Sequence, residues 1–204
     1  MVIRSSENVR VSLSREDLLP WAQQSLAFYG LDLSRISTVF LAQAYSSEAN
    51  GVFDTFDLTQ PIKSLEGLSP QDSVGAADQF KHQPLTGLYK KHFMSARFLP
   101  KNLINFIRSK DGKTQFNKAW DEAKALSRSE YIDEKFIGYL THRITVDPIQ
   151  IKSSSKTMTG EWVIFHKHED KNYYLTIASH NESNDQIYAR VSLACQIDKL
   201  PFSL

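Results

Sequence analysis

The chain has 204 residues, and its 24 basic and 23 acidic side chains give a formal net charge of +1. Hydrophobic residues make up 41% and charged residues 23%, which is the balance of an ordinary globular protein. This composition excludes a disordered charged tail, a collagen and a small disulfide-stapled domain. The near-zero net charge argues against capture of nucleic acid by bulk electrostatics, but it leaves room for a local basic face.

A single cysteine, Cys195, excludes an intrachain disulfide and a cysteine-based zinc site. Residues 1–10 lack the apolar core of a signal peptide, and no run approaches about 18 consecutive apolar residues. We therefore expect a protein of the reducing cytoplasm without a membrane span. Because domains usually hold about 100–200 residues, we predict a single domain over 1–204, with a subdivision into 1–80 and 81–204 as the alternative.

The first elements are predicted from alternation and capping. Apolar and polar residues alternate over 8–13, which favours a short strand. Ser14 suits the cap of a following helix whose first turn carries two acidic residues, and Gly30 suits its end. Segment 36–45 fits a helix or a strand, and 51–58 indicates a strand.

Segment 59–77 contains prolines, glycines and scattered serines, which indicates a loop that is either a domain boundary or a mobile lid. The middle of the chain is predicted to be helical. Segment 84–99 places apolar residues and His92 on one helical face.

Further helices are predicted over 100–108 and 115–127, with a turn at 111–113 between them. Another helix begins at Ser129, and the Asp-Pro pair at 147–148 breaks it. Its buried stripe is predicted to be Ile132, Phe136, Leu140 and Ile144.

The clearest strands are 161–165 and 173–177, which are rich in β-branched and aromatic residues. The charged residues 168–171 indicate a hairpin loop between them, and a helix over 184–195 follows. These elements predict an α+β fold: a helical N-terminal and middle region, with a C-terminal antiparallel β-hairpin packed on helices. The buried face of the hairpin is predicted to carry Trp162, Ile164, Leu175 and Ile177.

The hairpin register suggests a chemical site. A four-residue loop places Glu161 opposite Ala178, so that His180 lies one diagonal step away on the same face, with Thr176 close by. A carboxylate beside an imidazole raises the imidazole pKa and fixes its tautomer, which is an acid–base arrangement. An ion pair on a solvent-exposed face is the alternative explanation.

Residues 89–93, followed by Arg97, form the densest basic and aromatic cluster of the sequence. His92 lies on the apolar face of the predicted helix with Lys90, Lys91 and Arg97 around it, an arrangement that suits contact with phosphate or an RNA backbone. The alternative is a core histidine beside a solvated basic face.

Other chemistry has little support. His166 and His168 have a spacing that metal sites use, but no third ligand completes a set. The sequence contains no motif for nucleotide binding, Rossmann redox chemistry or serine hydrolysis, and glycine is scarce at 8 residues. We therefore predict neither a metal nor a cofactor.

Two hypotheses of different class follow. The first is a metal-independent ribonuclease or phosphodiester-cleaving domain that acts on RNA or another phosphate-bearing ligand. Its predicted site has His180 and His92 as acid and base and Glu161 as orienting carboxylate, and these three are predicted to lie on one pocket wall. Lys91 or Arg97 is predicted to stabilise the developing charge, and Thr176 is a further predicted substrate contact. The second is a non-catalytic protein-interaction module of inhibitor or immunity type, which binds a protein partner through its aromatic side chains.

Overall fold

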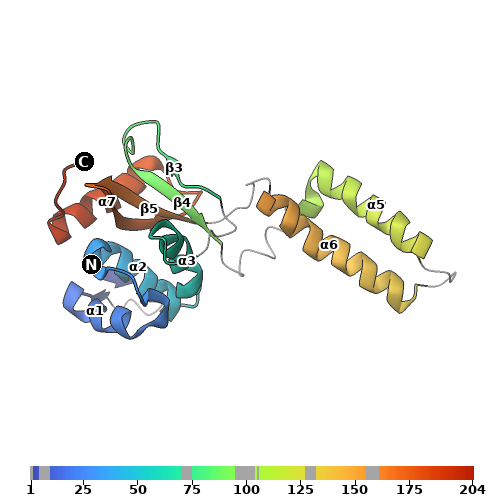
Figure 1. Ribbon diagram of the computed structural model, residues 1–204, viewed down its shortest axis with the longest axis horizontal. Coiled ribbons are helices and arrows are strands. Elements are labelled where there is room, and N and C mark those ends of the chain that lie inside the picture. The colour runs from blue at the N-terminus through green and yellow to red at the C-terminus, as the bar shows by residue number, and fades with distance from the viewer. Residues whose placement is uncertain are drawn as a thin grey trace. The chain divides into compact units, whose positions relative to one another are not determined.

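The computed structural model describes residues 2–4, 10–69, 75–94, 104, 106–126, 132–154 and 161–204. The chain divides into two compact units (Figure 1). Unit 1 comprises Met1–Ser95 and Gly160–Leu204, and unit 2 comprises Ala96–Thr159. The boundaries between these units differ from the predicted subdivision, because segment 59–77 lies entirely inside unit 1.

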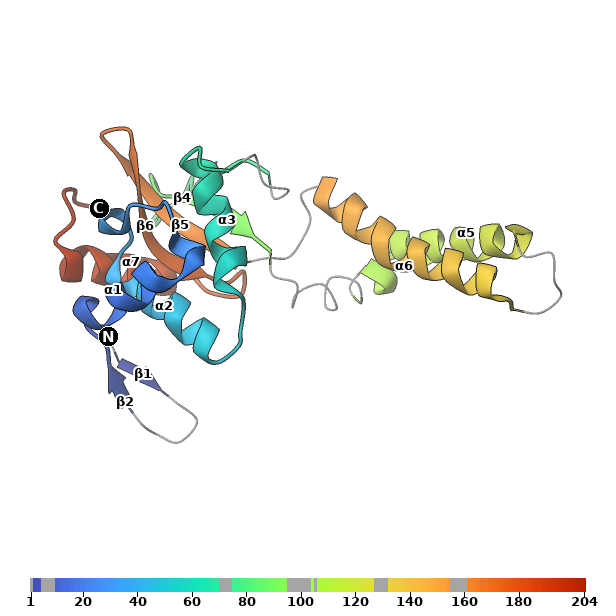
Figure 2. The same ribbon diagram turned by 60° about the horizontal axis from the view of Figure 1, so that its bottom comes forward.

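Unit 1 has the predicted α+β composition. Its four-stranded antiparallel sheet has the order β3-β4-β5-β6, formed by Asp78–Gln79, Tyr89–Phe93, Glu161–His168 and Lys171–Ala178. Its helices are α1 (Arg15–Gln24), α2 (Thr38–Ala49), α3 (Thr55–Leu65) and α7 (Asn184–Asp198). A separate two-stranded ribbon pairs β1 (Val2–Arg4) with β2 (Arg10–Ser12), and Figure 2 shows it beside α1.

Two hydrophobic cores lie against the sheet. The first joins α1, α2 and α3 to Phe93, Val163, Phe165, Tyr174 and Ile177. The second joins α7 to Ile164, Leu175 and Ala178, together with Leu85 and Leu88 from the segment before β4. The central strands are therefore apolar on both sides, and both cores are built from described residues of unit 1.

The predicted start of the first helix is confirmed. Ser14 caps α1 in a capping box: its hydroxyl accepts from the Asp17 N–H at 3.3 Å, and the Asp17 carboxylate accepts from the Ser14 N–H at 2.9 Å. The helix ends at Gln24 rather than at Gly30, and a short 3-10 turn, Leu26–Phe28, follows it.

The strand predicted over 51–58 is wrong, and the loop predicted over 59–77 is wrong for 59–65, whereas 66–69 and 75–77 are turn or irregular as predicted. Asp54 caps α3, which begins at Thr55 and continues to Leu65. Leu58 and Ile62 are fully buried in the first core, and this packing outweighs the loop-forming tendency of Pro61. Residues 70–74 lie outside the described residues.

The predicted helix over 84–99 is also wrong where the structure describes it. Residues 89–93 form strand β4, which pairs with β5 along its whole length. Leu85 and Leu88, which suggested a helical stripe, are buried in the second core from a turn segment that precedes the strand. Because side chains alternate between the two faces of a strand, Lys90 lies on the same face as His92 and Lys91 lies on the opposite face.

The predicted hairpin is confirmed, and its register holds as far as the Phe165–Tyr174 pair. His168 and Lys171 already pair, so the turn between them has two residues, Glu169 and Asp170, rather than the four predicted. Both have positive φ, as in the tight turns that suit β-hairpins. A β-bulge then shifts the register, so that Trp162 rather than Glu161 lies opposite Ala178.

The bulge also divides the predicted buried face of the hairpin. Ile164 and Leu175 contact the core beneath α7, and Trp162 packs at its margin. Ile177 instead belongs to the core beneath α1–α3. The expectation of one buried and one open face is therefore wrong for the centre of this hairpin.

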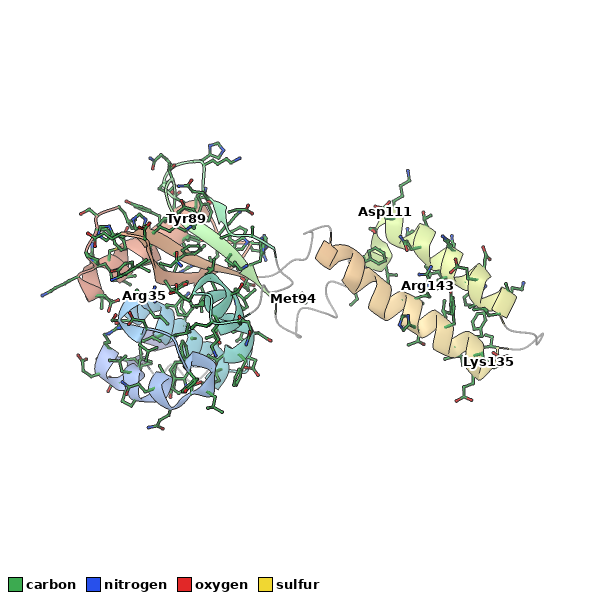
Figure 3. The ribbon with its side chains drawn as sticks, viewed as in Figure 1. Arg35, Tyr89, Met94, Asp111, Lys135 and Arg143 are labelled. Carbon is green, nitrogen blue, oxygen red and sulfur yellow. The ribbon has the colours of Figure 1, made fainter. Side chains whose placement is uncertain are left out.

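Unit 2 is a helical hairpin of α5 (Lys110–Leu126) and α6 (Glu134–Ser154), which lie side by side in Figures 1 and 2. Arg143 of α6, labelled in Figure 3, forms an ion pair with Glu122 of α5 at 3.1 Å. Tyr139 donates a hydrogen bond to the same carboxylate at 2.8 Å.

Two predicted interruptions of these helices are wrong. Gly112 is helical and packs so tightly that an added Cβ would lie 1.8 Å from the Phe106 carbonyl oxygen. Helix α6 continues through the Asp-Pro pair at 147–148 to Ser154. In the predicted stripe Phe136 is buried, Leu140 and Ile144 are half-buried and Ile132 is exposed, whereas Ser129 lies outside the described residues.

Candidate functional site

Strand pairing brings His92 and His180 together. His92 lies directly opposite Trp162 in the β4–β5 ladder, and His180 follows the end of β6. The two imidazole rings are stacked, with centroids 5.1 Å apart and planes 27° apart. His92 is half-buried and His180 is exposed.

Trp162 lies at the centre of this group. Its indole N–H donates to His92 Nε2 at 3.1 Å, and its ring centroid is 4.2 Å from that of His180. Lys90 Nζ lies 4.4 Å from the Trp162 centroid and 5.2 Å from that of Phe80. We call these five side chains the Trp162 cluster: Phe80, Lys90, His92, Trp162 and His180.

The surroundings of His92 keep its ring neutral. Burial lowers the pKa of His92 from its ordinary value of 6.5 to about 4, and the positive charges of His180 and Lys90 act in the same direction. Asp78, which lies opposite Lys90 in the β3–β4 ladder, opposes the shift. The second ring nitrogen, Nδ1, is buried and has no hydrogen-bond partner among the residues that the structure describes.

Glu161 does not join this cluster through the predicted diagonal. The bulge moves Ala178 opposite Trp162, and Glu161 lies opposite Phe93 of β4. Since side chains alternate along a strand, Glu161 lies on the sheet face opposite to that of Trp162. The register from which the contact between Glu161 and His180 was predicted is therefore wrong beyond the bulge.

Lys91 is likewise directed away from His92. It lies opposite Val163, is only 4% exposed, and donates from Nζ to the Gly75 carbonyl at 2.6 Å. The helix prediction had placed both Lys90 and Lys91 around His92, whereas the strand places Lys90 on the face of His92 and Lys91 on the opposite face. Arg97 lies outside the described residues.

Thr176 links the edge strand β6 to helices α2 and α7. Its hydroxyl donates to Gln43 Oε1 at 2.8 Å and accepts from Arg190 Nε at 3.1 Å. The Gln43 amide also pairs with both the N–H and the C=O of Ile177, each at 2.9 Å. These contacts close the outer edge of β6 with side chains from α2 and α7, so the position of Thr176 has a structural explanation.

Sequence reasoning thus missed the central members of the cluster, Trp162 and Phe80, and preferred Lys91 to Lys90. One usable signal was present: Lys90 and His92 are two residues apart, a spacing that places side chains on one face of a strand. The position of Trp162 beside them depends on pairing across about 70 residues, which local patterns do not reveal.

His166 and His168 serve a second aromatic group. Their rings lie 4.3 and 5.5 Å from that of Phe202, near the C-terminus. Burial lowers the pKa of His166, and the charge of His168 adds to this effect.

Across the described residues, no group of three or more His, Cys, Asp or Glu side chains is arranged to hold a metal ion.

A groove of about 610 Å³ lies elsewhere, near the start of α1 and the end of α7. Two of its charged lining residues, Arg15 and Asp198, already make structural contacts within the fold. Arg15 donates to the carbonyls of Ile36 and Leu33, at 2.9 and 2.6 Å, and Asp198 accepts from the Thr38 N–H at 2.8 Å. This groove therefore offers little unused hydrogen-bonding capacity for a ligand.

Comparisons of the chain with protein-family models, curated proteins and solved structures found no match. Within the portion of the chain that the structure describes, no helix has both the length and the apolar character needed to cross a membrane.

Proposed function

We propose that this protein is a metal-independent ribonuclease whose site is the Trp162 cluster. The observation that carries the proposal is the stacking of His92 and His180, with ring centroids 5.1 Å apart, beside the ammonium group of Lys90. A positioned imidazole that transfers the proton and a cation that stabilises the developing charge can cleave RNA without a metal, because the RNA supplies its own nucleophile.

The roles follow from exposure and protonation. His180 is exposed and is the proton-transfer residue: it accepts the proton of the 2′-hydroxyl as that oxygen attacks the adjacent phosphorus. The bond from phosphorus to the 5′-oxygen breaks, and His180 returns the proton to this leaving oxygen. The products are a 2′,3′-cyclic phosphate and a 5′-hydroxyl, with no net proton consumed. Lys90 stabilises the negative charge that develops on the phosphoryl oxygens.

His92 has a different role from the one predicted from sequence. With a pKa of about 4 it is neutral near pH 7, and its Nε2 lone pair is already bound to Trp162. A general acid or base works best when its pKa lies near the working pH, so His92 is poorly matched to proton transfer. Its stacked ring orients His180.

The proposal is tested with the purified full-length chain, single-stranded RNA and excess EDTA. We expect cleavage that yields 2′,3′-cyclic phosphate ends. A matched substrate with one 2′-deoxy nucleotide should resist cleavage at that position, because the nucleophile is missing. Failure to cleave a varied set of RNAs in EDTA, or equal cleavage of the deoxy position, would overturn the proposal.

A second candidate, a protein-interaction module, is favoured by unit 2. The described residues of this unit expose several large apolar side chains: Ile104, Ile107, Phe116, Trp120, Leu126, Ile132 and Ile137. Exposed apolar groups of this kind are common at protein interfaces. Sedimentation of the wild type as a dimer or larger assembly, and of Trp120→Ser as a monomer, would support this candidate. A monomeric wild type would rule out self-association, the simplest interaction that this candidate predicts.

A further inference from the structure

Trp162 contacts every other member of the Trp162 cluster, and this arrangement indicates a role beyond packing. We propose that Trp162 is a positioning residue that holds His92 in the Nδ1–H tautomer, leaving His180 as the sole proton-accepting imidazole of the pair. The consequence for catalysis rests on the proposed function, whereas the tautomer itself does not.

The first step of the argument is the direction of one hydrogen bond. An indole N–H is a donor only, so the nitrogen that it contacts must carry a lone pair. Trp162 Nε1 lies 3.1 Å from His92 Nε2, which makes Nε2 the acceptor. A neutral imidazole has one protonated nitrogen, and the proton of His92 is therefore on Nδ1.

The second step is that the strands fix this contact. His92 and Trp162 are directly opposite each other in the β4–β5 ladder, where side chains on one face are close neighbours. Burial reduces competition from water, because His92 is half-buried and its Nδ1 atom is inaccessible. The hydrogen bond is thus part of the sheet, and the tautomer is fixed before any substrate arrives.

The third step concerns the other ring. The Trp162 ring packs against His180 at 4.2 Å between centroids, and Lys90 Nζ lies 4.4 Å from the same ring. One side chain therefore sets the tautomer of one histidine and the positions of the second histidine and the cation. In a site of this kind, misplacement of a group by about 1 Å costs about a hundredfold in rate.

The variant Trp162→Phe separates the hydrogen bond from the packing. It keeps an aromatic ring but removes the indole N–H. The matched control is Trp21→Phe, the same change in α1, where Trp21 packs edge-on against Phe28 and Tyr45 at 5.4 and 5.3 Å. Two-dimensional 1H–15N spectra of the imidazole nitrogens report the tautomer directly, and loss of a signal in His92→Ala assigns it.

We expect the wild type and Trp21→Phe to show His92 protonated on Nδ1, and Trp162→Phe to gain the Nε2–H form. A wild-type His92 protonated on Nε2 overturns the inference without needing any variant to fold. An unchanged tautomer in a folded Trp162→Phe protein also overturns it.

RNA cleavage is measured on the same three proteins. We expect Trp162→Phe to lose about tenfold or more in rate, part of the 10²–10⁴ that positioned proton transfer contributes, and Trp21→Phe to match the wild type. If the wild type cleaves and a folded Trp162→Phe protein cleaves equally well, Trp162 is not a positioning residue. If the wild type cleaves nothing, the proposed function fails, and the tautomer alone decides whether Trp162 fixes His92.

Discussion

Lys90 and Lys91 are neighbours of the same chemical type with opposite surroundings. The ammonium group of Lys90 lies over two aromatic rings beside the histidine pair, whereas that of Lys91 is buried against the Gly75 carbonyl. Their separation follows from the alternation of a strand. One residue should therefore affect activity and the other stability.

We expect Lys90→Met to reduce RNA cleavage by about tenfold or more, since it removes a charge that stabilises the transition state, while the melting temperature changes little. Lys91→Met should instead lower the free energy of unfolding by about 1.5–3 kcal/mol, the range for a hydrogen bond to a charged group. Cleavage rates and urea unfolding of both variants provide the measurement. The reverse pattern, with activity lost only in Lys91→Met, would contradict this assignment.

At the scale of elements, the hairpin shows where sequence reasoning holds and where it stops. The β-branched and aromatic runs of β5 and β6 and the turn at Glu169–Asp170 are local features, and they predict the pairing as far as Phe165 and Tyr174. The bulge beyond that pair has no local signal. It moves Glu161 away from the position that the regular ladder predicts.

The same limit explains the error at β4. Leu85 and Leu88 follow a helical spacing, but their burial comes from α7 and the sheet rather than from a helix of their own. The class of the fold and the capping of α1 were accessible from sequence. The proximity of His92, Trp162 and Lys90 depends on the pairing of β4 with β5, and no local pattern predicts that pairing.

The interior of β6 gives a direct test of the hairpin's packing. Leu175 is fully buried in the core beneath α7. We expect Leu175→Ala to lower the free energy of unfolding by about 2–5 kcal/mol, because it leaves a cavity in that core. Chemical denaturation measures the loss, and Leu193→Ala on the exposed side of α7 serves as the control. A loss below about 1 kcal/mol would contradict the described packing.

A half-buried ion pair joins Arg35, in the 3-10 turn Leu33–Arg35, to Glu66 at the end of α3, and hydrogen bonds join Glu66 to β6. Arg35 lies 2.6 Å from the carboxylate of Glu66, which also accepts from the Tyr174 hydroxyl at 2.6 Å and from Asn172 at 2.9 Å. Burial alone would raise the pKa of Glu66, but these hydrogen bonds and the charge of Arg35 outweigh it and lower the pKa below its ordinary value of 4.5.

This shift predicts how stability depends on pH. A carboxyl with a lowered pKa in the folded state stabilises the protein above about pH 4.5, and this contribution disappears as the pH falls through its folded pKa. We therefore expect the difference in unfolding free energy between the wild type and Glu66→Gln to be largest near pH 7 and to shrink below about pH 4.5. A difference that stays constant down to pH 3 would contradict the assignment.

At the scale of the whole molecule, unit 2 is inserted between two paired strands. In the sequence, unit 2 separates β4 from β5. Phe93 at the end of β4 nevertheless lies opposite Glu161 at the start of β5, so the two segments of unit 1 meet in the sheet where unit 2 interrupts them. Both cores beside that sheet are formed by described residues of unit 1. Unit 1 thus has the elements of an independently folding domain.

We expect that replacing residues 95–160 by a hairpin turn of about two to five residues leaves unit 1 folded. The measurement is the 1H–15N spectrum of the shortened chain, in which the signals of β4, β5 and α7 should keep their dispersion. A collapsed spectrum, typical of an unfolded chain, would mean that unit 1 needs unit 2. If the shortened chain folds, its cleavage activity also tells whether unit 2 contributes to the site.

The central claim is that an exposed histidine stacked on a neutral one performs the chemistry, and His180→Ala tests it most directly. The matched control is His82→Ala, an exposed histidine in the turn segment before β4. The measurement is the rate of RNA cleavage in EDTA, with the melting temperature of each protein verified. We predict that His180→Ala loses a factor of about 10² or more while His82→Ala retains the wild-type rate. An active wild type whose His180→Ala variant cleaves equally well would contradict the account.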